Sequence, residues 1–377
     1  MYMSKSMMTV VIGFLMLTSC GNPPSDDVSQ ESDTRLVELT PRLVLGTGDY
    51  DEECSFAMVS DTDFLSDGSI AVLDRLKCSV SVFSRTGEYL YSIGRNGDGP
   101  GEFTSPGRMI CIGDSLVITD RSAIRASVFS QSGDYIRELS DSYSTQLPSE
   151  SDNMGARRIL GGVTVVSPSS DDIDLNLTYL LLVFDMQYNA VDTLLSHTFL
   201  HDPEDISYSL HNTAYSTTFA ADDEGNYFLA PVSTDEYSIN GFNQNGDTLV
   251  SINRNLSPVE KTAQALDEEA DRMIRILEAI NPGYEYSYEP LACRYMIPPY
   301  GLHTDSCDRI WVLNGLFSMP MFDVYDYAGE HLFIAKAHGI PVEEQNEMLR
   351  WTVTEHGLIA FSVDPIEYPR VYVYDLP

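Results

Sequence analysis

Short apolar runs alternate with glycine-containing polar turns near the start of the chain. Apolar residues gather in residues 69–73, 80–83 and 89–93, with turn signals at Asp67-Gly68 and Thr86-Gly87. Runs of this length bounded by glycine turns predict antiparallel strands joined by hairpins. With residues 56–59 ahead of them, they form a four-stranded meander. One meander of this size cannot bury both of its faces, so the pattern predicts neighbouring copies.

The same unit of an aromatic residue, a polar turn and an extended exit recurs along the chain. The first unit begins at Phe83 and reads Phe-Ser-Arg-Thr-Gly-Glu-Tyr-Leu. Further units begin at Phe129, Phe184, Phe242 and Tyr325, and Tyr374-Asp375 begins a sixth. A period of about 40 to 50 residues with four strands is typical of the blades of a β-propeller. The repeats therefore predict an all-β, six-bladed β-propeller.

These repeats resemble those of six-bladed β-propellers of the NHL/TolB-like type, found in envelope lipoproteins of Bacteroides-type bacteria. The resemblance also rests on Asp74-Arg75 and Asp120-Arg121, which close second strands, and on the glycine-rich residues 94–103. It covers nearly the whole chain after residue 33. It implies the fold and says little about function, because propellers support many activities. Since the Asp-Arg pairs repeat between blades, we assign them to turn hydrogen bonding.

An amino-terminal strand is expected to close the ring. Residues 42–46 resemble the exit strand of the first blade, residues 89–94, whereas the last blade ends at its third strand, residues 371–375. Pairing the two would remove an open sheet edge, which is an aggregation hazard. We expect blades one to six at about residues 55–94, 107–140, 158–196, 216–253, 296–336 and 349–374.

One segment, residues 257–281, departs from the strand pattern between blades four and five. Ser257, Pro258 and Glu260 form a helix start, with a cap, proline at the first position and glutamate at the third. One apolar stripe follows: Val259, Ala263, Leu266, Ala270, Met273, Leu277 and Ile280. We expect the stripe to pack on the propeller; pairing as a coiled coil is the alternative.

The first residues indicate export and lipid attachment. An apolar run over residues 7–17 follows Lys5 and has the length of a signal peptide, too short to span a bilayer. It ends in Leu-Thr-Ser-Cys-Gly, which resembles a lipobox with Cys20 as the lipidated residue; a plain secretory signal is the alternative. We therefore expect a signal peptide at 1–19, an acidic tether at 20–33 and the propeller at 34–377, anchored to the outer membrane in the cell envelope, with either the periplasmic or the outer surface possible.

The composition limits the classes of ligand and metal site that we expect. The formal charge of −35 argues against nucleic acid and anionic membrane surfaces as ligands. The cysteines beyond Cys20 are odd in number and show no CxxC spacing, so we expect at most one or two disulfides and no zinc site. His197 and His201 share an acidic loop with Asp202. A solvated loop explains this set more simply than a metal site. We expect no metal and no cofactor.

The long connections and the positions of the few arginines suggest that a ligand binds at one opening, or mouth, of the central channel. Residues 94–107, 141–157, 197–215 and 254–295 each join an outer strand to the next inner strand, and such connections emerge around one mouth of the channel. Arginines and aromatics near the expected inner-strand starts are the candidate ligand-binding residues: Phe56, Arg108, Arg157, Arg158, Tyr215, Arg294, Tyr295, Arg350 and Trp351. Arginine forks suit carboxylate, sulfate or phosphate, and aromatic faces suit sugars or planar ligands. Arginines that pair with acidic residues between blades are the alternative.

Two functions remain open. The first is a non-catalytic binding or scaffold propeller for a protein, peptide or anionic carbohydrate of the envelope. The second is a metal-dependent lyase or lactonase, because some NHL-like propellers use a channel metal. The second requires several His, Asp or Glu residues on inner strands. The expected inner strands at residues 109–112, 159–160 and 217–220 are poor in them, which favours binding.

Overall fold

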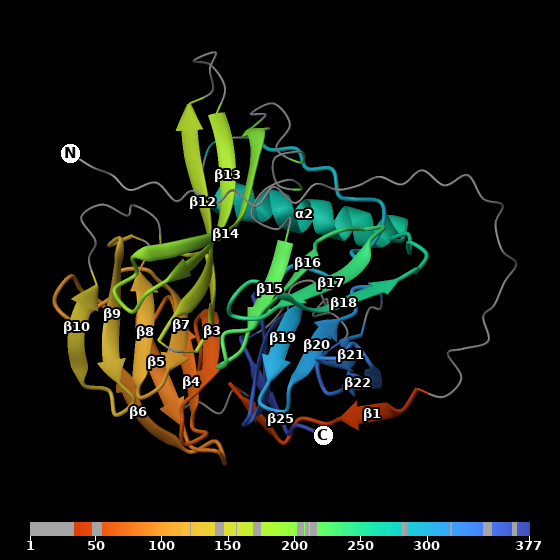
Figure 1. Cartoon of the computed structure of the whole chain (residues 1–377). Helices are drawn as coiled ribbons and strands as arrows, with labels where there is room; N and C mark the ends of the chain where they lie inside the picture. Colours follow the sequence, from red (N-terminus) through yellow and green to blue (C-terminus); the bar gives the residue numbers. More distant parts are fainter. Residues whose placement is uncertain are drawn as a thin grey trace, which may run out of the picture. The chain divides into compact units, whose positions relative to one another are not determined.

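Six sheets form the β-propeller, and in each of them four strands form an antiparallel set with the innermost strand at one edge (Figure 1). The computed structural model describes residues 34–46, 55–120, 122–139, 147–155, 157–168, 175–201, 207, 211, 217–280, 283, 285–316, 319–341, 349–363 and 368–377. All statements below concern these residues. No helix among them is long and apolar enough to cross a membrane.

The first three sheets are plain meanders. The first contains β3 (Val59–Phe64), β4 (Ile70–Asp74), β5 (Ser79–Phe83) and β6 (Tyr89–Ile93). The second contains β7 (Pro106–Ile112), β8 (Ser115–Asp120), β9 (Arg125–Ser130) and β10 (Tyr135–Leu139). The third contains β11 (Glu150–Asn153), β12 (Ile159–Pro168), β13 (Leu175–Phe184) and β14 (Ala190–His201).

The last three sheets include the helix and the two amino-terminal strands. The fourth contains β15 (Thr217–Ala221), β16 (Tyr227–Pro231), β17 (Tyr237–Phe242) and β18 (Thr248–Arg254). After α2 (Ala263–Ile280), the fifth contains β19 (Leu302–Asp305), β20 (Arg309–Leu313), β21 (Met321–Asp326) and β22 (His331–Ala337), with β1 (Leu36–Leu39) at its edge. The sixth contains β23 (Leu349–Thr354), β24 (Gly357–Ser362), β25 (Val371–Tyr374) and β2 (Leu43–Leu45).

The repeated sequence unit forms the hairpin between the third and fourth strands of the first five sheets. In the first, Gly87 N–H donates to Ser84 O at 2.9 Å and Ser84 N–H to Glu88 O at 2.8 Å. Gly87 has a φ of 88°, a left-handed conformation that suits glycine. In the third sheet Tyr188 occupies the corresponding turn with a φ of 58°, so this copy adopts the same left-handed conformation without a glycine.

Ring closure by the amino-terminal strand is confirmed. β2 pairs antiparallel with β25, with Leu43 opposite Val373. The sequence did not predict that β1 would extend the fifth sheet, where it pairs parallel with β22 and Leu36 lies opposite Ile334. The two strands therefore join the amino-terminal segment to both the fifth and the sixth sheets.

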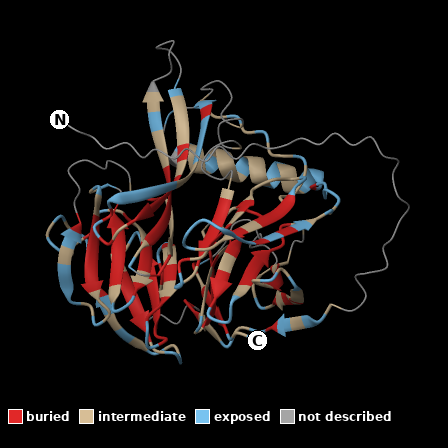
Figure 2. Cartoon of the chain, in the orientation of Figure 1, coloured by how far each residue is buried: buried red, intermediate tan, exposed pale blue. Residues whose placement is uncertain are grey.

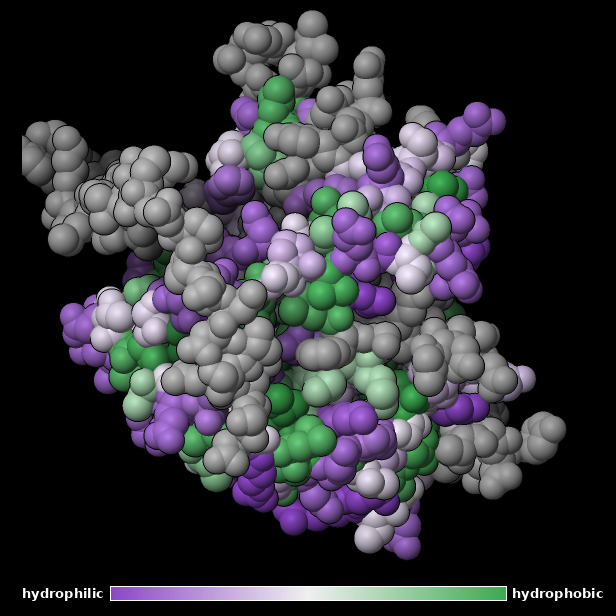
Figure 3. All heavy atoms as spheres, turned by 90° about the vertical axis from the view of Figure 1, so that its right-hand side faces the viewer, coloured by the Kyte–Doolittle hydropathy of each residue, from purple (hydrophilic) through white to green (hydrophobic). Residues whose placement is uncertain are grey.

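Hydrophobic cores lie between neighbouring sheets. The described residues form six clusters, one at each of the six junctions around the ring. Figure 2 shows the buried residues concentrated in the inner strands and the exposed ones along the outer edges. On the face drawn in Figure 3, hydrophobic residues form separate groups among hydrophilic ones, so the coloured residues show no single broad apolar surface there.

The expected starts of the third and fifth blades differ from the structure. The third sheet begins at Glu150 rather than near Arg158, and Ile159 belongs to its second strand. The innermost strand of the fifth sheet begins at Leu302 rather than near Met296. β11 reads Glu-Ser-Asp-Asn, which carries no hydrophobic signal; it is a strand because it pairs with β12 from Ile159 to Gly162.

The helix also begins later than expected. α2 begins at Ala263, not Ser257, and Thr262 Oγ1 accepts a hydrogen bond from the Ala265 N–H at 3.2 Å as its cap. The preceding residues pair instead with a later segment, since Lys261 N–H donates to Ala292 O and Arg294 N–H donates to Val259 O. The apolar stripe is only partly covered, as Leu266, Met273 and Leu277 are half-buried.

Candidate functional site

A pocket of about 610 Å³ runs between the six innermost strands, a size within the usual range for small ligands. Because every sheet begins with its innermost strand, all six run in the same direction around the axis. Residues at the strand starts, such as Arg108 and Arg350, line one end. Residues just after the strand ends, such as Gly113, Asp308 and His356, line the other. The two ends differ in charge.

Two arginines from different sheets meet over one tyrosine at the first end. Arg350 Cζ of β23 lies 4.0 Å from the centroid of the Tyr300 ring, and Arg108 Cζ of β7 lies 5.2 Å from it. Arg108 Nε also donates to Ser149 O at 2.8 Å, across to the third sheet. Glu150 lines the pocket next to Ser149. We call Arg108, Glu150, Tyr300 and Arg350 the arginine mouth.

A strained turn holds Tyr300 in place. Tyr300 has a φ of 59°, an uncommon value for a residue with a large side chain. Gly301 N–H donates to Pro298 O at 3.0 Å, and Leu313 N–H donates to Gly301 O at 2.7 Å. A Cβ at Gly301 would lie 2.8 Å from Pro298 O. Strain of this kind costs about 1–3 kcal/mol and is concentrated at functional sites. The backbone conformation of Tyr300 therefore favours a functional role for this residue.

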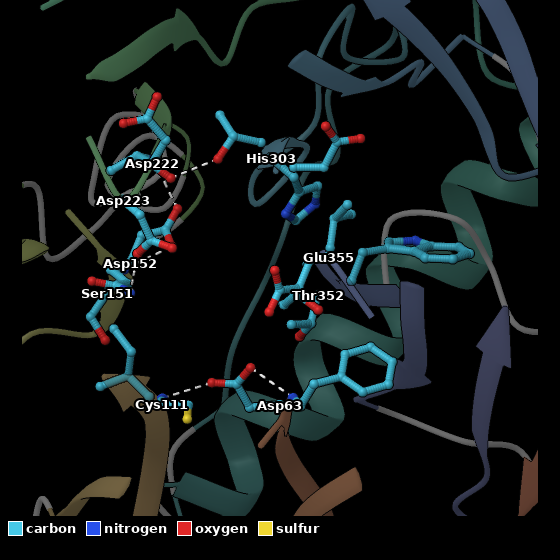
Figure 4. A pocket seen from close by; sticks show the side chains of 18 of the residues that line it. Asp63, Cys111, Ser151, Asp152, Asp222, Asp223, His303, Thr352 and Glu355 are labelled. Atoms are coloured by element: carbon cyan, nitrogen blue, oxygen red, sulfur yellow. Dashed lines mark hydrogen bonds between the residues drawn. The ribbon is translucent and has the colours of Figure 1, made fainter. Parts of the chain in front are cut away.

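Carboxylates and hydroxyls tie each of several inner strands to the next. Asp61 and Asp63 of β3 accept hydrogen bonds from the Met109 N–H at 2.9 Å and the Cys111 N–H at 2.7 Å of β7; the second is a dashed line in Figure 4. Asp152 of β11 accepts from the Ala221 N–H at 2.9 Å. The inner strands have no strand partner on the axis side, so these side chains satisfy backbone donors that would otherwise lie unpaired.

Threonine hydroxyl groups likewise satisfy backbone carbonyl oxygens of neighbouring inner strands. Thr304 Oγ1 donates to Ala221 O at 2.6 Å, from the fifth sheet to the fourth. Thr352 Oγ1 donates to Thr62 O at 2.8 Å, from the sixth sheet to the first. We call these carboxylate and hydroxyl contacts the inner-strand links.

Burial dominates the acid–base properties of the pocket. It raises the pKa of Asp63 to about 8 and that of Asp152 to about 6, against backbone hydrogen bonds that lower them. It also raises the pKa of Glu150 to about 8, although Arg108 and Arg350 oppose the shift. Burial raises the pKa of the Cys111 thiol as well. Near neutral pH, part of the acidic lining is therefore protonated.

His303 of β19 lies between the two ends. Burial lowers the pKa of its imidazole to about 4, against a hydrogen bond to the Tyr300 backbone that raises it, so the ring is neutral at pH 7. The ring nitrogen that donates to the Tyr300 carbonyl carries the proton, which makes Nε2 an acceptor. His303 Nε2 is buried without a hydrogen-bond partner among the described residues. Figure 4 shows His303 facing Asp152 across the pocket.

The second end is acidic. Its exposed carboxylates follow the ends of β15, β19 and β23, and we call them the acidic rim: Asp223, Glu224, Asp308 and Glu355. Partial burial and the negative charges of Asp222 and Glu355 raise the pKa of Asp223. Carboxylates from the fourth and sixth sheets therefore repel one another across this opening.

Three of the sequence-predicted site residues line the pocket: Arg108, Arg350 and Trp351. The Trp351 ring packs into the core between the fifth and sixth sheets, with its centroid 4.9 Å from that of Phe322. Phe56 lies in the core between the sixth and first sheets, edge-to-face with Phe83.

The other candidates lie elsewhere. Arg157 is exposed in the turn between β11 and β12, and Arg158 follows it; neither is among the residues that line the pocket. Arg294 and Tyr295 belong to the segment that pairs beside Val259, where Lys261 Nζ lies 6.0 Å from the Tyr295 ring centroid. Tyr215 and Cys20 lie outside the described residues.

Sequence reasoning missed several pocket residues. They are Asp61, Asp63, Glu150, Asp152, Tyr300 and His303. The acidic residues recur at alternate positions, as in Asp-Thr-Asp and Glu-Ser-Asp, so a period of two was available as a signal. The expectation that inner strands are poor in acidic residues was therefore wrong, because β11 was missed and β3 was not considered.

A match to a family model supports the fold. Residues 45–139 match the DUF5128 family model, described as a 6-bladed beta-propeller. A search of curated proteins found no match.

Among solved structures, a member of the DUF4221 family from Bacteroides vulgatus is 12% identical, with 91% of this chain and 99% of that one covered and a TM-score of 0.48. A protein described as exported from Bacteroides fragilis is 11% identical, with 90% and 98% covered and a TM-score of 0.46. The calcium-binding protein regucalcin from Agrobacterium tumefaciens is 8% identical, with 91% and 97% covered and a TM-score of 0.45. The chain is a six-bladed β-propeller.

Proposed function

We propose that the chain is a lipid-anchored propeller of the cell envelope that binds an anionic ligand at the arginine mouth without catalysing a reaction. The observation that carries the proposal is the approach of Arg108 and Arg350, from the second and sixth sheets, to the ring of Tyr300. In a chain with 22 Lys and Arg against 57 Asp and Glu, two guanidinium groups meet at one pocket end, close to the carboxyl groups of Asp61 and Glu150. Because burial raises the pKa of both carboxyl groups, the guanidinium groups form a local positive site there. Guanidinium forks bind carboxylates in a two-point geometry, and the tyrosine face suits a sugar or planar group.

The proton-transfer groups of the pocket are poorly placed for catalysis. Asp61, Asp63 and Asp152 accept backbone hydrogen bonds in the inner-strand links, so they already serve the fold. His303 is neutral and a weak base, since burial lowers its pKa to about 4. The described residues contain no group of three or more His, Cys, Asp or Glu side chains arranged to hold a metal ion. No specific observation therefore favours the metal-dependent lyase or lactonase.

The binding proposal has a direct test with Arg350→Gln. We expect this variant to bind galacturonate at least about tenfold more weakly than the unchanged chain, because a hydrogen bond to a charged group contributes about 1.5–3 kcal/mol. Isothermal titration calorimetry at pH 7 with galacturonate, and with galactose as the neutral sugar, measures the change.

Arg157→Gln is the matched control, because Arg157 is exposed outside the pocket. It should bind galacturonate like the unchanged chain, and thermal unfolding should show that both variants are folded. Equal binding by Arg350→Gln and Arg157→Gln, or equal affinity for galactose and galacturonate, would contradict an anion site at the arginine mouth.

The envelope location rests on residues 1–33, outside the described residues, and has its own test. Cys20→Ser is expected to abolish incorporation of labelled palmitate and to leave residues 1–19 attached, because thioether lipidation at the cysteine precedes removal of the signal. Labelling of cells and the intact mass of the chain in the membrane fraction measure both effects. Cys54→Ser should be labelled and processed normally; palmitate in the Cys20→Ser chain would refute this anchor.

A further inference from the structure

The pocket has opposite charges at its two ends. The arginine mouth presents Arg108 and Arg350 at the strand starts. The acidic rim presents Asp223, Glu224, Asp308 and Glu355 after the strand ends, all exposed. A ligand that carries only a negative charge is attracted to the first end and repelled by the second. A ligand with opposite charges at its two ends is attracted by both.

The distance between the ends sets the length of such a ligand. Both Arg350 and Glu355 belong to β23 or the residue after it, five residues apart. Five steps at about 3.3 Å each give about 17 Å along the axis. An extended peptide advances by about 3.3–3.6 Å per residue, so a peptide of about five residues spans the pocket from one end to the other.

His303 lines the pocket between the two ends, and Figure 4 shows its ring inside the pocket. Its Nε2 atom is fully buried, so the charged groups at the two ends supply the main polar contacts for a ligand. A sugar acid bound at the arginine mouth would make no contact with the acidic rim.

We propose that the anionic ligand is a short peptide with free termini, lying along the axis with its α-carboxylate at Arg108 and Arg350 and its ammonium group at the acidic rim. The inference rests on the proposed function and names its ligand class. The carboxylate accepts hydrogen bonds from the guanidinium groups beside Tyr300. The ammonium group lies between carboxylates of the fourth and sixth sheets, Asp223 and Glu355, and lowers their mutual repulsion.

Blocked peptides test each end separately. The probes are penta-alanine, its C-terminal amide, its N-acetyl form and di-alanine, titrated by calorimetry into the purified chain at pH 7 and low salt. We expect the amide to bind at least tenfold more weakly than penta-alanine, because it lacks the carboxylate. We expect the N-acetyl form to bind three- to tenfold more weakly, since the rim is exposed to solvent. Di-alanine should bind at least tenfold more weakly than penta-alanine because it cannot reach both ends.

Variants assign each effect to its residues. In Arg350→Gln, the difference in affinity between penta-alanine and its amide should shrink several-fold, because only Arg108 remains to bind the carboxylate. In the double variant Asp223→Asn and Glu355→Gln, penta-alanine and its N-acetyl form should bind with equal affinity. The C-terminal amide should still bind more weakly than penta-alanine in this variant. Glu88→Gln is the control, because Glu88 is exposed on the hairpin between β5 and β6, away from the pocket. It should preserve both differences.

The outcomes separate this inference from the proposed function. If galacturonate binds through Arg350 and the four peptides bind equally or not at all, the peptide inference is wrong and the anion site stands. If the N-acetyl penalty persists in the rim double variant, the orientation along the axis is wrong. If neither galacturonate nor any peptide responds to Arg350→Gln, both proposals fail.

Discussion

Asp74→Ala is expected to lower the free energy of unfolding by about 4 kcal/mol or more. The Asp74 side chain has no exposed surface and accepts hydrogen bonds from four backbone N–H groups. They belong to Ala57 at 2.6 Å, Met58 at 3.2 Å, Leu76 at 3.0 Å and Lys77 at 3.0 Å. Each buried donor left without an acceptor costs about 1–3 kcal/mol. Urea unfolding followed by circular dichroism measures the loss.

The control is Asp67→Ala. Asp67 is exposed in the turn before β4, where it accepts a hydrogen bond from the Ser69 N–H at 2.8 Å, so we expect a loss of about 1 kcal/mol or less. Asp120→Ala should resemble Asp74→Ala, because Asp120 accepts hydrogen bonds from the N–H groups of Thr104, Ser105, Ser122 and Ala123 in the second sheet. A loss in Asp74→Ala no greater than in Asp67→Ala would show that the carboxylate does not hold the sheet.

The stability of the propeller is expected to fall as the pH rises from about 5 to about 9. Burial raises the pKa of Asp63 and of Glu150 to about 8 and that of Asp152 to about 6 in the folded chain. In the unfolded chain these groups ionise near pH 4. Between pH 4 and 8 the unfolded state therefore binds fewer protons than the folded state, and stability decreases with pH. The combined loss is on the order of several kcal/mol, at about 1.4 kcal/mol per pKa unit.

A group with the opposite shift limits stability at low pH. His331 and Arg254 lower the pKa of Asp323, although burial opposes them. The ionised Asp323 carboxylate therefore adds to the free energy of unfolding above pH 4, and this stabilisation is lost as the pH falls through the lowered pKa. Together with the raised groups, this places the highest stability near pH 5.

Asp63→Asn tests the source of the pH dependence. The amide cannot ionise, so this variant should lose less stability than the unchanged chain between pH 5 and 9, by a few kcal/mol. At pH 5 it should be slightly less stable, because the amide oxygen replaces only one of the two acceptors that serve Phe64 and Cys111. Urea midpoints at several pH values measure this. The exposed Asp98→Asn should keep the slope of the unchanged chain, and an equally steep slope in Asp63→Asn would refute the assignment.

The fold was predictable from the sequence because its repeating unit is local. The aromatic residue, turn and exit strand from Phe83 to Tyr89 lie within one hairpin, so the pattern needs no knowledge of distant contacts. Closure was predictable for a similar reason, since residues 42–46 repeat the pattern of an exit strand and β25 lacked one. The position of β1 was not predictable, because its parallel pairing with β22 does not belong to the repeated pattern.

The pocket was less predictable because tertiary contacts define its lining. β11 is wholly polar and half-buried, and only its pairing with β12 makes it a strand. Tyr300 lies in a connection whose position depends on Pro298 and Gly301. Arg108 and Arg350 were among the expected residues because they lie near the starts of true inner strands. Arg158 and Arg294 were expected for the same reason, but their strands were misplaced.

The pairing of β2 with β25 has a consequence for biosynthesis. The partners Leu43 and Val373 are 330 residues apart in the sequence. The ribosome must therefore synthesise all of the intervening chain before the last sheet gains its fourth strand. Until that moment the nascent polypeptide has no closed ring, and the outer edge of β25 lacks its strand partner.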